Sequence, residues 1–205
     1  IRDSFKESGK WVYAYADNYA QGDYLLSTFA DKLYLNPVGN VDIRGVGTST
    51  PFFTGLLDKL GIKVQVVKVG TYKSAVEPFI LTSMSEAARH QNQVFVDSIW
   101  GYYSNTVAAN RSVTPATVSA WADSLTFAWT AERDVDAGIV TEKSYRREVE
   151  DMLRDLTGVD AGKSLRLVTP KNYVASRSGD LGDSSGDHIA VLYAVGDIVD
   201  SGDEG

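Results

Sequence analysis

Short apolar runs alternate with helical apolar spacings along the first third of the chain. Residues 11–16 form an aromatic, β-prone run that predicts a buried strand. A helix is predicted to start near Gly22, and a second strand to follow over residues 32–35. Residues 51–60 predict another short helix, and the β-branched run at 63–69 predicts another strand. This alternation favours an α/β fold with a mainly parallel sheet wrapped by helices.

The middle of the chain has helical spacing throughout. Ser83 and Glu86 have the spacing of a capping box, and apolar residues continue from it at helical intervals to about Arg111. Thr114 before Pro115 places a cap residue ahead of a first-turn proline, which predicts a further helix. Helices are also predicted over residues 132–137 and 145–156.

Composition changes near the end of the chain. Residues 177–188 are rich in Ser, Gly and Asp, which is typical of a linker, and residues 189–195 then begin a new strand. We therefore expect a first domain over residues 1–176, cut at its start, then the linker, and the opening strand of a second domain over residues 189–205.

Charge and composition exclude several classes of protein. The chain has 205 residues, with 20 basic and 27 acidic side chains and a formal charge of −7. No run of Lys or Arg is long enough to contact successive phosphates of a nucleic acid, so nucleic acid is not an expected partner. There is no cysteine, no apolar run of about eighteen residues, and no metal or nucleotide motif. The two histidines, His90 and His188, have no triad-like neighbours, and His90 is expected on an exposed helix face.

Lys73 is the residue with the strongest claim to chemistry. It follows a predicted strand and a turn at Gly70, and it precedes an apolar stretch. Most lysines in such a position are solvated loop residues. A lysine acts as a general base only where burial or a nearby cation lowers its pKa from about 10.4 toward neutrality. Val69, Val76 and Phe79 are the candidates for that apolar enclosure.

The segment around Lys73 also carries a family resemblance. Residues 70–79, Gly-Thr-Tyr-Lys-Ser-Ala-Val-Glu-Pro-Phe, resemble the signature around the catalytic lysine of the long, two-repeat signal peptide peptidase A family. The likeness is close over residues 9–111, looser to residue 175, and returns at residues 189–200. Collinear matching segments lie at residues 19–24, 56–60, 84–89 and 105–111.

The resemblance implies a ClpP/crotonase-like α/β fold and a serine–lysine protease. In that family the first repeat supplies the lysine general base, here Lys73, and the second supplies the serine, without metal or organic cofactor. It further implies a membrane-associated homotetramer, anchored by a segment outside this chain, on the periplasmic side of the bacterial inner membrane. The implied substrates are cleaved signal peptides.

Gln21 marks this chain as the half without the nucleophile. It stands where the resemblance places the serine, within the turn at residues 20–24, and an amide side chain cannot attack a carbonyl. The chain alone is therefore expected to be inactive. Ser74 adjoins Lys73, but neighbouring side chains on an extended segment point apart, so it is not proposed as the nucleophile.

Other notable side chains have structural explanations. Glu77 is expected to bond the backbone around Pro78 and to point away from the lysine amine, because a carboxylate there would hold the lysine protonated. The aromatic residues Phe95, Trp100 and Tyr103 are expected to serve core or inter-subunit packing rather than substrate binding.

Two alternatives share the predicted fold. A crotonase-type acyl-coenzyme A enzyme uses paired backbone amides and glutamates, and nothing in the sequence resembles its coenzyme A contacts. A non-catalytic scaffold domain is the other alternative. Replacing Lys73 in the full-length protein separates it from a protease, because a scaffold would keep its function.

Overall fold

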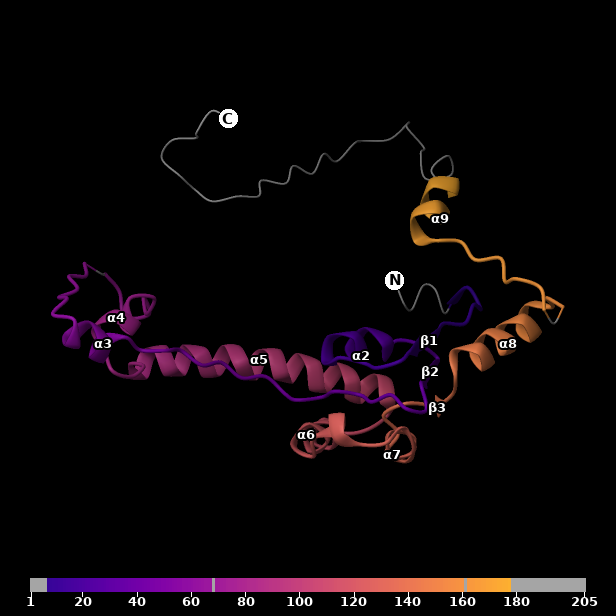
Figure 1. Cartoon of the computed structure of the whole chain (residues 1–205), viewed down its shortest axis with the longest axis horizontal. Coiled ribbons are helices and arrows are strands. Elements are labelled where there is room, and N and C mark those ends of the chain that lie inside the picture. Colours follow the sequence, from indigo (N-terminus) through magenta and orange to yellow (C-terminus); the bar gives the residue numbers. More distant parts are fainter. Residues whose placement is uncertain (1–6, 68, 161, 178–205) are drawn as a thin grey trace. The chain divides into compact units, whose positions relative to one another are not determined.

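The computed structural model describes residues 7–67, 69–160 and 162–177 (Figure 1). The chain divides into two compact units, residues up to 161 and residues from 162 onward. In the second unit, the described residues contain one helix, α9 (Pro170–Arg177). The predicted linker over residues 177–188, apart from Arg177, and the predicted strand over residues 189–205 lie outside the described residues.

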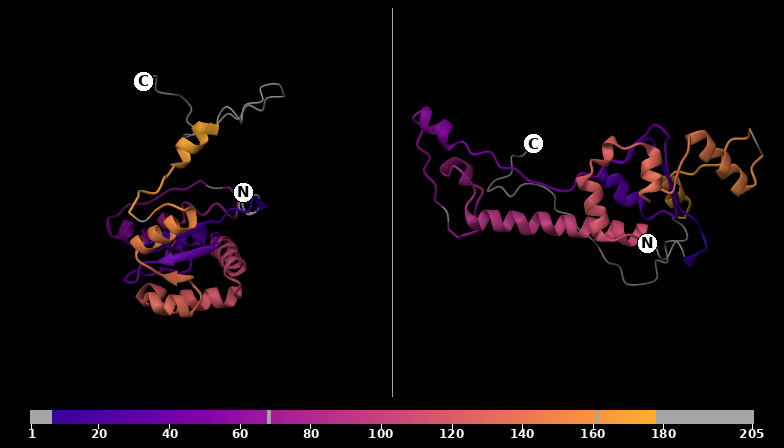
Figure 2. Two further views of the ribbon diagram at one scale, coloured as in Figure 1. Left: turned by 90° about the vertical axis from the view of Figure 1, so that its right-hand side faces the viewer. Right: turned by 90° about the horizontal axis from the view of Figure 1, so that it is seen from below.

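A parallel sheet forms the centre of the first unit. Within the described residues its order is β1 (Tyr13–Ala16), β2 (Lys32–Leu35) and β3 (Glu142–Lys143), and both neighbouring pairs are parallel. Helix α2 (Gln21–Ser27) connects β1 to β2, as parallel strands require a crossover (Figure 2). Helices and parallel strands therefore combine as the sequence predicted, and β1, α2 and β2 match the predicted elements.

The remaining helices of the first unit's core follow one another after residue 85. They are α5 (Glu86–Arg111), α6 (Pro115–Asp123), the 3₁₀ helix η1 (Thr126–Ala128), α7 (Ala131–Asp136) and α8 (Arg146–Thr157). All four α-helices were predicted to within about two residues, which is the usual spread of helix ends.

Local signals explain where these helices begin and end. Thr114 caps α6 by accepting a hydrogen bond from the Thr117 N–H, as predicted from the Thr-Pro pair. Glu148 reaches back to the Tyr145 N–H at the start of α8. Helix α5 is followed by its cap residue Ser112, which adopts the left-handed conformation that commonly closes helices.

The hydrophobic core lies between the sheet and helices α2, α5, α6 and α7. Leu33 and Leu35 of the central strand are completely buried. The hydroxyl of Tyr24 on α2 donates to the Ile139 carbonyl oxygen at 2.7 Å, so the crossover helix is bonded to the segment before β3. The other buried members of the cluster are Tyr19, Val41, Ile43, Tyr103, Val107, Ala108, Val118, Trp121, Ala131 and Val140.

A long excursion leaves this core between Ile43 and α5. We call residues 44–85 the arm. It contains α3 (Thr54–Lys59) and α4 (Glu77–Ile80), which lie near the N-terminal end of α5 in Figures 1 and 2. Its first part, residues 44–52, runs in extended form beside α5.

The arm holds two errors of the sequence-based prediction. Residues 63–67 and 69 form no strand, because they lie away from the sheet, where no neighbouring strand bonds their backbone. The predicted cap at Ser83 is also wrong. The Ser85 hydroxyl caps α5 by accepting a hydrogen bond from the Ala88 N–H, and the Glu77 carboxylate of α4 holds Ser85 in place.

Candidate active site

Lys73 lies on the turn between Gly70 and α4. Gly70 has a φ of +106°, a backbone conformation that glycine adopts without a steric penalty. The turn borders an open cavity of about 590 Å³. Seven further residues line this cavity, namely Val67, Val69, Tyr72, Ser74, Ala75, Val76 and Gln91.

The apolar enclosure expected around Lys73 is incomplete. Lys73 itself is exposed, and of the three candidate neighbours only Val76 is half-buried. Val69 is 79% exposed and Phe79 is 45% exposed. Burial that would free the lysine amine for base chemistry therefore has to come from a surface other than these side chains.

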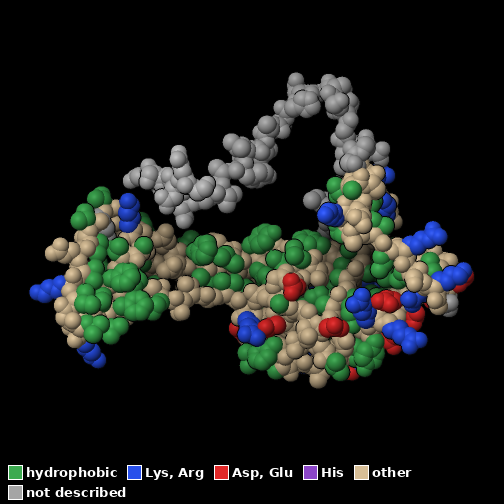
Figure 3. Space-filling view, turned by 45° about the horizontal axis from the view of Figure 1, so that its top comes forward, with side chains coloured by type: hydrophobic (Ala, Val, Ile, Leu, Met, Phe, Trp, Pro, Cys, Tyr) green, Lys and Arg blue, Asp and Glu red, His purple; other side chains and the backbone are tan. Residues whose placement is uncertain are grey.

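Apolar side chains are concentrated on this part of the surface. Figure 3 shows hydrophobic side chains gathered over α3 and α4 and along α5. Val67 is fully exposed, and Tyr72 is more than half exposed, next to the lysine cavity. Contiguous apolar surface on this scale is characteristic of sites that bind another protein surface or an apolar ligand.

Glu77 fixes the lysine-bearing turn to α5. Its carboxylate is buried and accepts hydrogen bonds from the N–H of Ser85 at 3.1 Å and from the Ser85 hydroxyl at 2.7 Å. Its own backbone N–H donates to the Ser74 carbonyl at 3.0 Å. The prediction that Glu77 bonds backbone is confirmed, but its partner is Ser85 rather than the peptide groups beside Pro78. The Lys73 turn is thereby attached to the first turn of a long helix.

The tip of the arm is closed by contacts between its two short helices. Phe53 and Phe79 stack with ring centroids 5.9 Å apart. The Phe53 N–H donates to the Pro78 carbonyl at 2.7 Å, and the Thr54 hydroxyl donates to the Leu81 carbonyl. These bonds hold α3 against α4, so the turn with Lys73 belongs to a locally folded unit.

Gln21 lies at the first position of α2 and does not line the Lys73 cavity. Its side chain instead bonds the root of the arm. The carboxamide oxygen accepts from the N–H groups of Arg44 at 2.8 Å and Gly45 at 3.0 Å, and its nitrogen donates to the Gly45 carbonyl at 3.0 Å. The sequence located this residue but gave no signal for its partners, which are more than twenty residues away.

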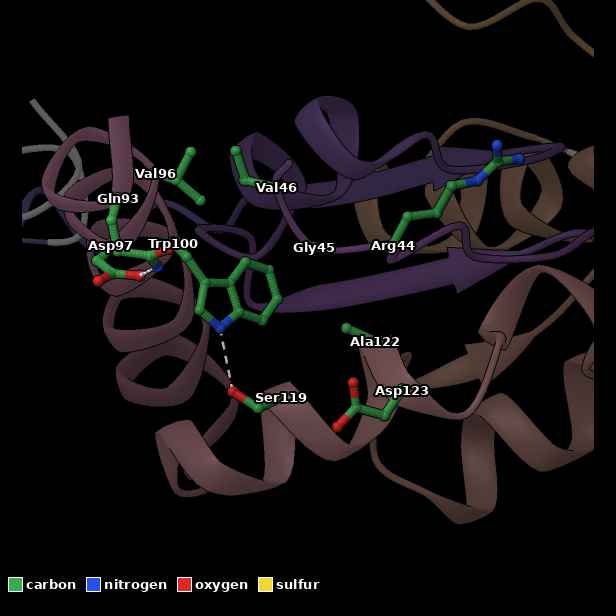
Figure 4. A pocket seen from close by; sticks show the side chains of 10 residues that line it. All are labelled: Arg44, Gly45, Val46, Gln93, Val96, Asp97, Trp100, Ser119, Ala122 and Asp123. Atoms are coloured by element: carbon green, nitrogen blue, oxygen red, sulfur yellow. Dashed lines mark hydrogen bonds between the residues drawn. The ribbon is translucent and has the colours of Figure 1, made fainter. Parts of the chain in front are cut away.

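The aromatic residues of α5 have different environments. Trp100 stacks on the buried Tyr103 at 5.3 Å, and its indole nitrogen donates to the Ser119 hydroxyl of α6 at 3.1 Å (Figure 4). These two rings therefore serve core packing, as expected. Phe95 is 64% exposed and does not belong to the hydrophobic core cluster. His90 is exposed, also as expected.

Asp134 is a buried acid that the sequence analysis missed. It is completely buried on the inner face of α7, and neither carboxylate oxygen has a hydrogen-bond partner among the described residues. Burial raises its pKa to about 7, although the nearby Val41 amide and the charge of Arg133 lower it. Its place three residues after the buried Ala131 is the signal that puts it on the inner face.

Two features are absent from the described residues. They contain no group of three or more His, Cys, Asp or Glu side chains placed to hold a metal ion. No helix in the described part of the chain is both long and apolar enough to cross a bilayer.

Comparison with known proteins identifies the class of this chain. Residues 4–160 match the model of peptidase family S49, and the chain belongs to that family. It is 38% identical to Protease 4 of Salmonella typhi and 35% identical to Protease 4 of Haemophilus influenzae, over 96% of the chain in each case. It is also 30% identical to the chloroplastic serine protease SPPA of Arabidopsis thaliana over 95% of the chain. The chain spans about a third of the length of each of these relatives, at 32%, 33% and 29%.

Proposed function

We propose that this chain supplies the general base, Lys73, of a serine–lysine endopeptidase whose serine lies in another part of the full-length protein. The observation that carries the proposal is the exposed Lys73 on a well-anchored turn, bordered by exposed apolar side chains. Such a lysine becomes a base only when a second surface buries it or brings a cation close to it. Family membership and the ClpP/crotonase-like fold that we propose for it are consistent with that arrangement.

The reaction we propose is acyl transfer from a peptide to a serine. Neutral Lys73 removes the proton from the serine hydroxyl, and the serine oxygen attacks the peptide carbonyl carbon. The C–N bond then breaks, and the protonated Lys73 returns its proton to the leaving amine. Water repeats the sequence to release the acid product. Glu77 contributes by holding the turn of Lys73 on α5 through Ser85.

We further propose cleaved signal peptides as the substrates. Signal peptides carry a central apolar segment, and the cavity beside Lys73 is lined by Val67, Val69 and Val76. The domain arrangement expected from the sequence, with a first repeat over residues 1–176 and a second beginning at residue 189, is part of the same proposal.

Assembly and location complete the proposal. We propose a homotetramer attached to the bacterial inner membrane through a segment other than the described helices, with its catalytic part on the periplasmic side. Exposed apolar side chains on α5, such as Phe95 and Tyr102, support contact with a second surface. Light scattering of the purified full-length protein measures the number of subunits directly.

Labelling by a fluorophosphonate tests the catalytic proposal, since this probe reacts with an activated serine. The full-length protein, its Lys73→Ala variant and a Lys63→Ala control are compared, because Lys63 is an exposed lysine on the same arm. Lys73→Ala is expected to slow phosphonylation of the serine, in which the serine oxygen displaces fluoride from phosphorus, by a factor of about 10²–10⁴, and Lys63→Ala to leave it unchanged. Unchanged labelling in Lys73→Ala contradicts the proposal and leaves the scaffold alternative.

A further inference from the structure

Gln21 forms the last hydrogen-bonded contact between the core and the extended part of the arm. Its carboxamide pairs with both the N–H and the C=O of Gly45 and with the N–H of Arg44. No hydrogen bond is found for residues 46–52 within the described structure, and bonding resumes at Phe53. The direction in which residues 46–52 leave the core is therefore set at Arg44 and Gly45.

The helix that carries Gln21 is firmly held. Tyr24, one turn along α2, is completely buried and bonds the Ile139 carbonyl at 2.7 Å. The Asn110 side chain of α5 donates to the Thr28 hydroxyl at the end of α2 at 3.0 Å. Gln21 therefore projects from an element fixed at two points, which makes it a rigid support for the arm.

The residues just before Gly45 are held as well. The Ile43 N–H donates to the buried Thr126 hydroxyl at 2.9 Å, Arg44 pairs with Asp42 at 2.7 Å, and its guanidinium lies over the Phe127 ring at 5.2 Å. Figure 4 shows Gly45 and Val46 passing beside α5, opposite Trp100. The Gln21 bonds extend this fixed region by the two residues at which the arm begins.

The arm is connected to the core through two routes, helix α5 and the extended residues 46–52. A single helix leaves bending and twisting of the tip free, and a second fixed connection restricts both. Seven extended residues span roughly 23 Å, so a rotation of about 10° at the root displaces the far end by about 4 Å. A misplacement of about 1 Å at a catalytic group is enough to reduce the rate about 10²-fold.

We propose that Gln21 is a positioning residue: its carboxamide fixes the root of the arm and so sets where Lys73 is presented to the serine. The inference rests on the proposed role of Lys73. It gives the residue at the position of the missing nucleophile a function of its own. A carboxamide suits this position because it offers the acceptor and the donor that a backbone N–H and C=O require.

Hydrogen exchange of the full-length protein, followed by mass spectrometry, measures the clamp directly. Gln21→Ala is expected to speed exchange of the Arg44 and Gly45 amides at least tenfold, because both lose their acceptor. Asn105→Ala is the matched control, since Asn105 also donates from a side-chain amide to a backbone carbonyl, that of Gly101. It should leave exchange at residues 44–45 unchanged. Unchanged exchange in Gln21→Ala overturns the inference whatever the role of Lys73.

Fluorophosphonate labelling measures the consequence for catalysis. Gln21→Ala is expected to lower the rate constant of serine labelling about 10- to 100-fold while the final labelled fraction stays constant. A merely structural role would lower the labelled fraction instead. Gln21→Glu keeps the acceptor for both N–H groups and should restore part of the rate. Faster exchange with an unchanged rate of labelling also overturns the inference.

The same measurements separate this inference from the proposed function. If Lys73→Ala is labelled at the normal rate, the proposed function fails, while exchange at residues 44–45 still decides whether Gln21 clamps the arm. If Gln21→Ala does not fold, Gln21→Met supplies both measurements, because methionine keeps the length of the side chain without the carboxamide. Faster exchange at residues 44–45 and slower labelling are expected, and wild-type values for both contradict the inference.

Discussion

The core of the first unit and the arm differ in how far they bury their apolar side chains. In the core, Leu33 and Leu35 are completely buried, and the hydroxyls of Tyr19 and Tyr24 reach backbone carbonyls. In the arm, Val67 is completely exposed, and Val69 and Leu60 are 79% and 63% exposed. The core thus buries its central apolar side chains, whereas the arm presents surface of a kind that proteins usually cover.

This difference places the turn of Lys73, whose backbone is held by Glu77, in an exposed part of the molecule. The backbone of the arm is fixed by the hydrogen bonds of Glu77 and by the stack of Phe53 on Phe79. Many other apolar side chains of the arm remain exposed and form no core of their own. A backbone fixed in this way around open apolar surface is suited to meeting a second surface with little rearrangement.

Alanine in place of glycine should have the largest effect, and opposite effects in the two regions. A β-carbon at Gly39 would lie 1.8 Å from the Asp17 carbonyl oxygen, so the core backbone must shift. Gly39→Ala is expected to cost about 3–5 kcal/mol in the free energy of unfolding. A β-carbon at Gly55 in α3 would meet no atom within 4 Å, so Gly55→Ala should stabilise α3 by up to about 1 kcal/mol. Urea denaturation measures both, and equal losses would contradict the comparison.

The buried Asp134 predicts a dependence of core stability on pH. Burial raises its pKa from 3.8 to about 7, so the folded chain binds this proton more tightly than the unfolded chain. The contribution of this group to the free energy of unfolding is therefore present at low pH. It is lost as pH rises from about 4 to about 7, by up to about 4 kcal/mol. Asp134→Asn keeps the shape without the charge, and it should gain about 1–3 kcal/mol relative to wild type at pH 8.

Unfolding measured at several pH values tests this expectation. At pH 4 the variant should have no advantage, because Asp134 is already protonated there. Asp136→Asn is the control, since Asp136 lies on the same helix but is exposed. A gain for Asp134→Asn that does not change with pH would show that packing, not ionisation, is responsible.

Removal of the Glu77 carboxylate should loosen the arm without unfolding the core. Glu77→Ala deletes both bonds to Ser85, and the loss is expected to be about 1–3 kcal/mol, confined to local opening of the turn. Trypsin cleavage after Lys73 should therefore speed up about tenfold or more. Glu86→Ala is the control, because Glu86 is an exposed acid in the first turn of α5. Equal cleavage of both variants would show that Glu77 does not hold the turn.

The sequence predicted the core well because the core obeys local rules. Strands β1 and β2 came from short apolar runs, and α5 and α6 came from periodicity, with the α6 cap read from Thr114. Strand β3 was missed because it has only two residues and depends on β2 for its pairing. The elements that were predicted are those whose apolar positions along the chain follow the period of a strand or a helix.

The arm was predicted less well because its structure depends on partners distant in sequence. The run at residues 63–69 has the β-branched composition of a strand but no strand beside it. The cap of α5 was predicted at Ser83 but is Ser85, whose hydroxyl is held by the Glu77 carboxylate. The resemblance named Lys73, but neither it nor the periodicity indicated that Gln21 holds Arg44 and Gly45.

The smallest expected effect is the one that separates the chain alone from the full-length protein. Val67 is completely exposed and lines the cavity of Lys73. Val67→Ser should change the unfolding free energy of the 205-residue chain by less than about 0.5 kcal/mol, because no contact is lost. In the full-length protein the same change should weaken the contact of the surface that we propose to cover the cavity, and slower labelling by the fluorophosphonate would reveal it. Exposed Val38, which lies outside the arm, provides the control. If Val67→Ser and Val38→Ser behave alike in both proteins, the arm surface stays open to solvent, and the burial of Lys73 has to be sought elsewhere.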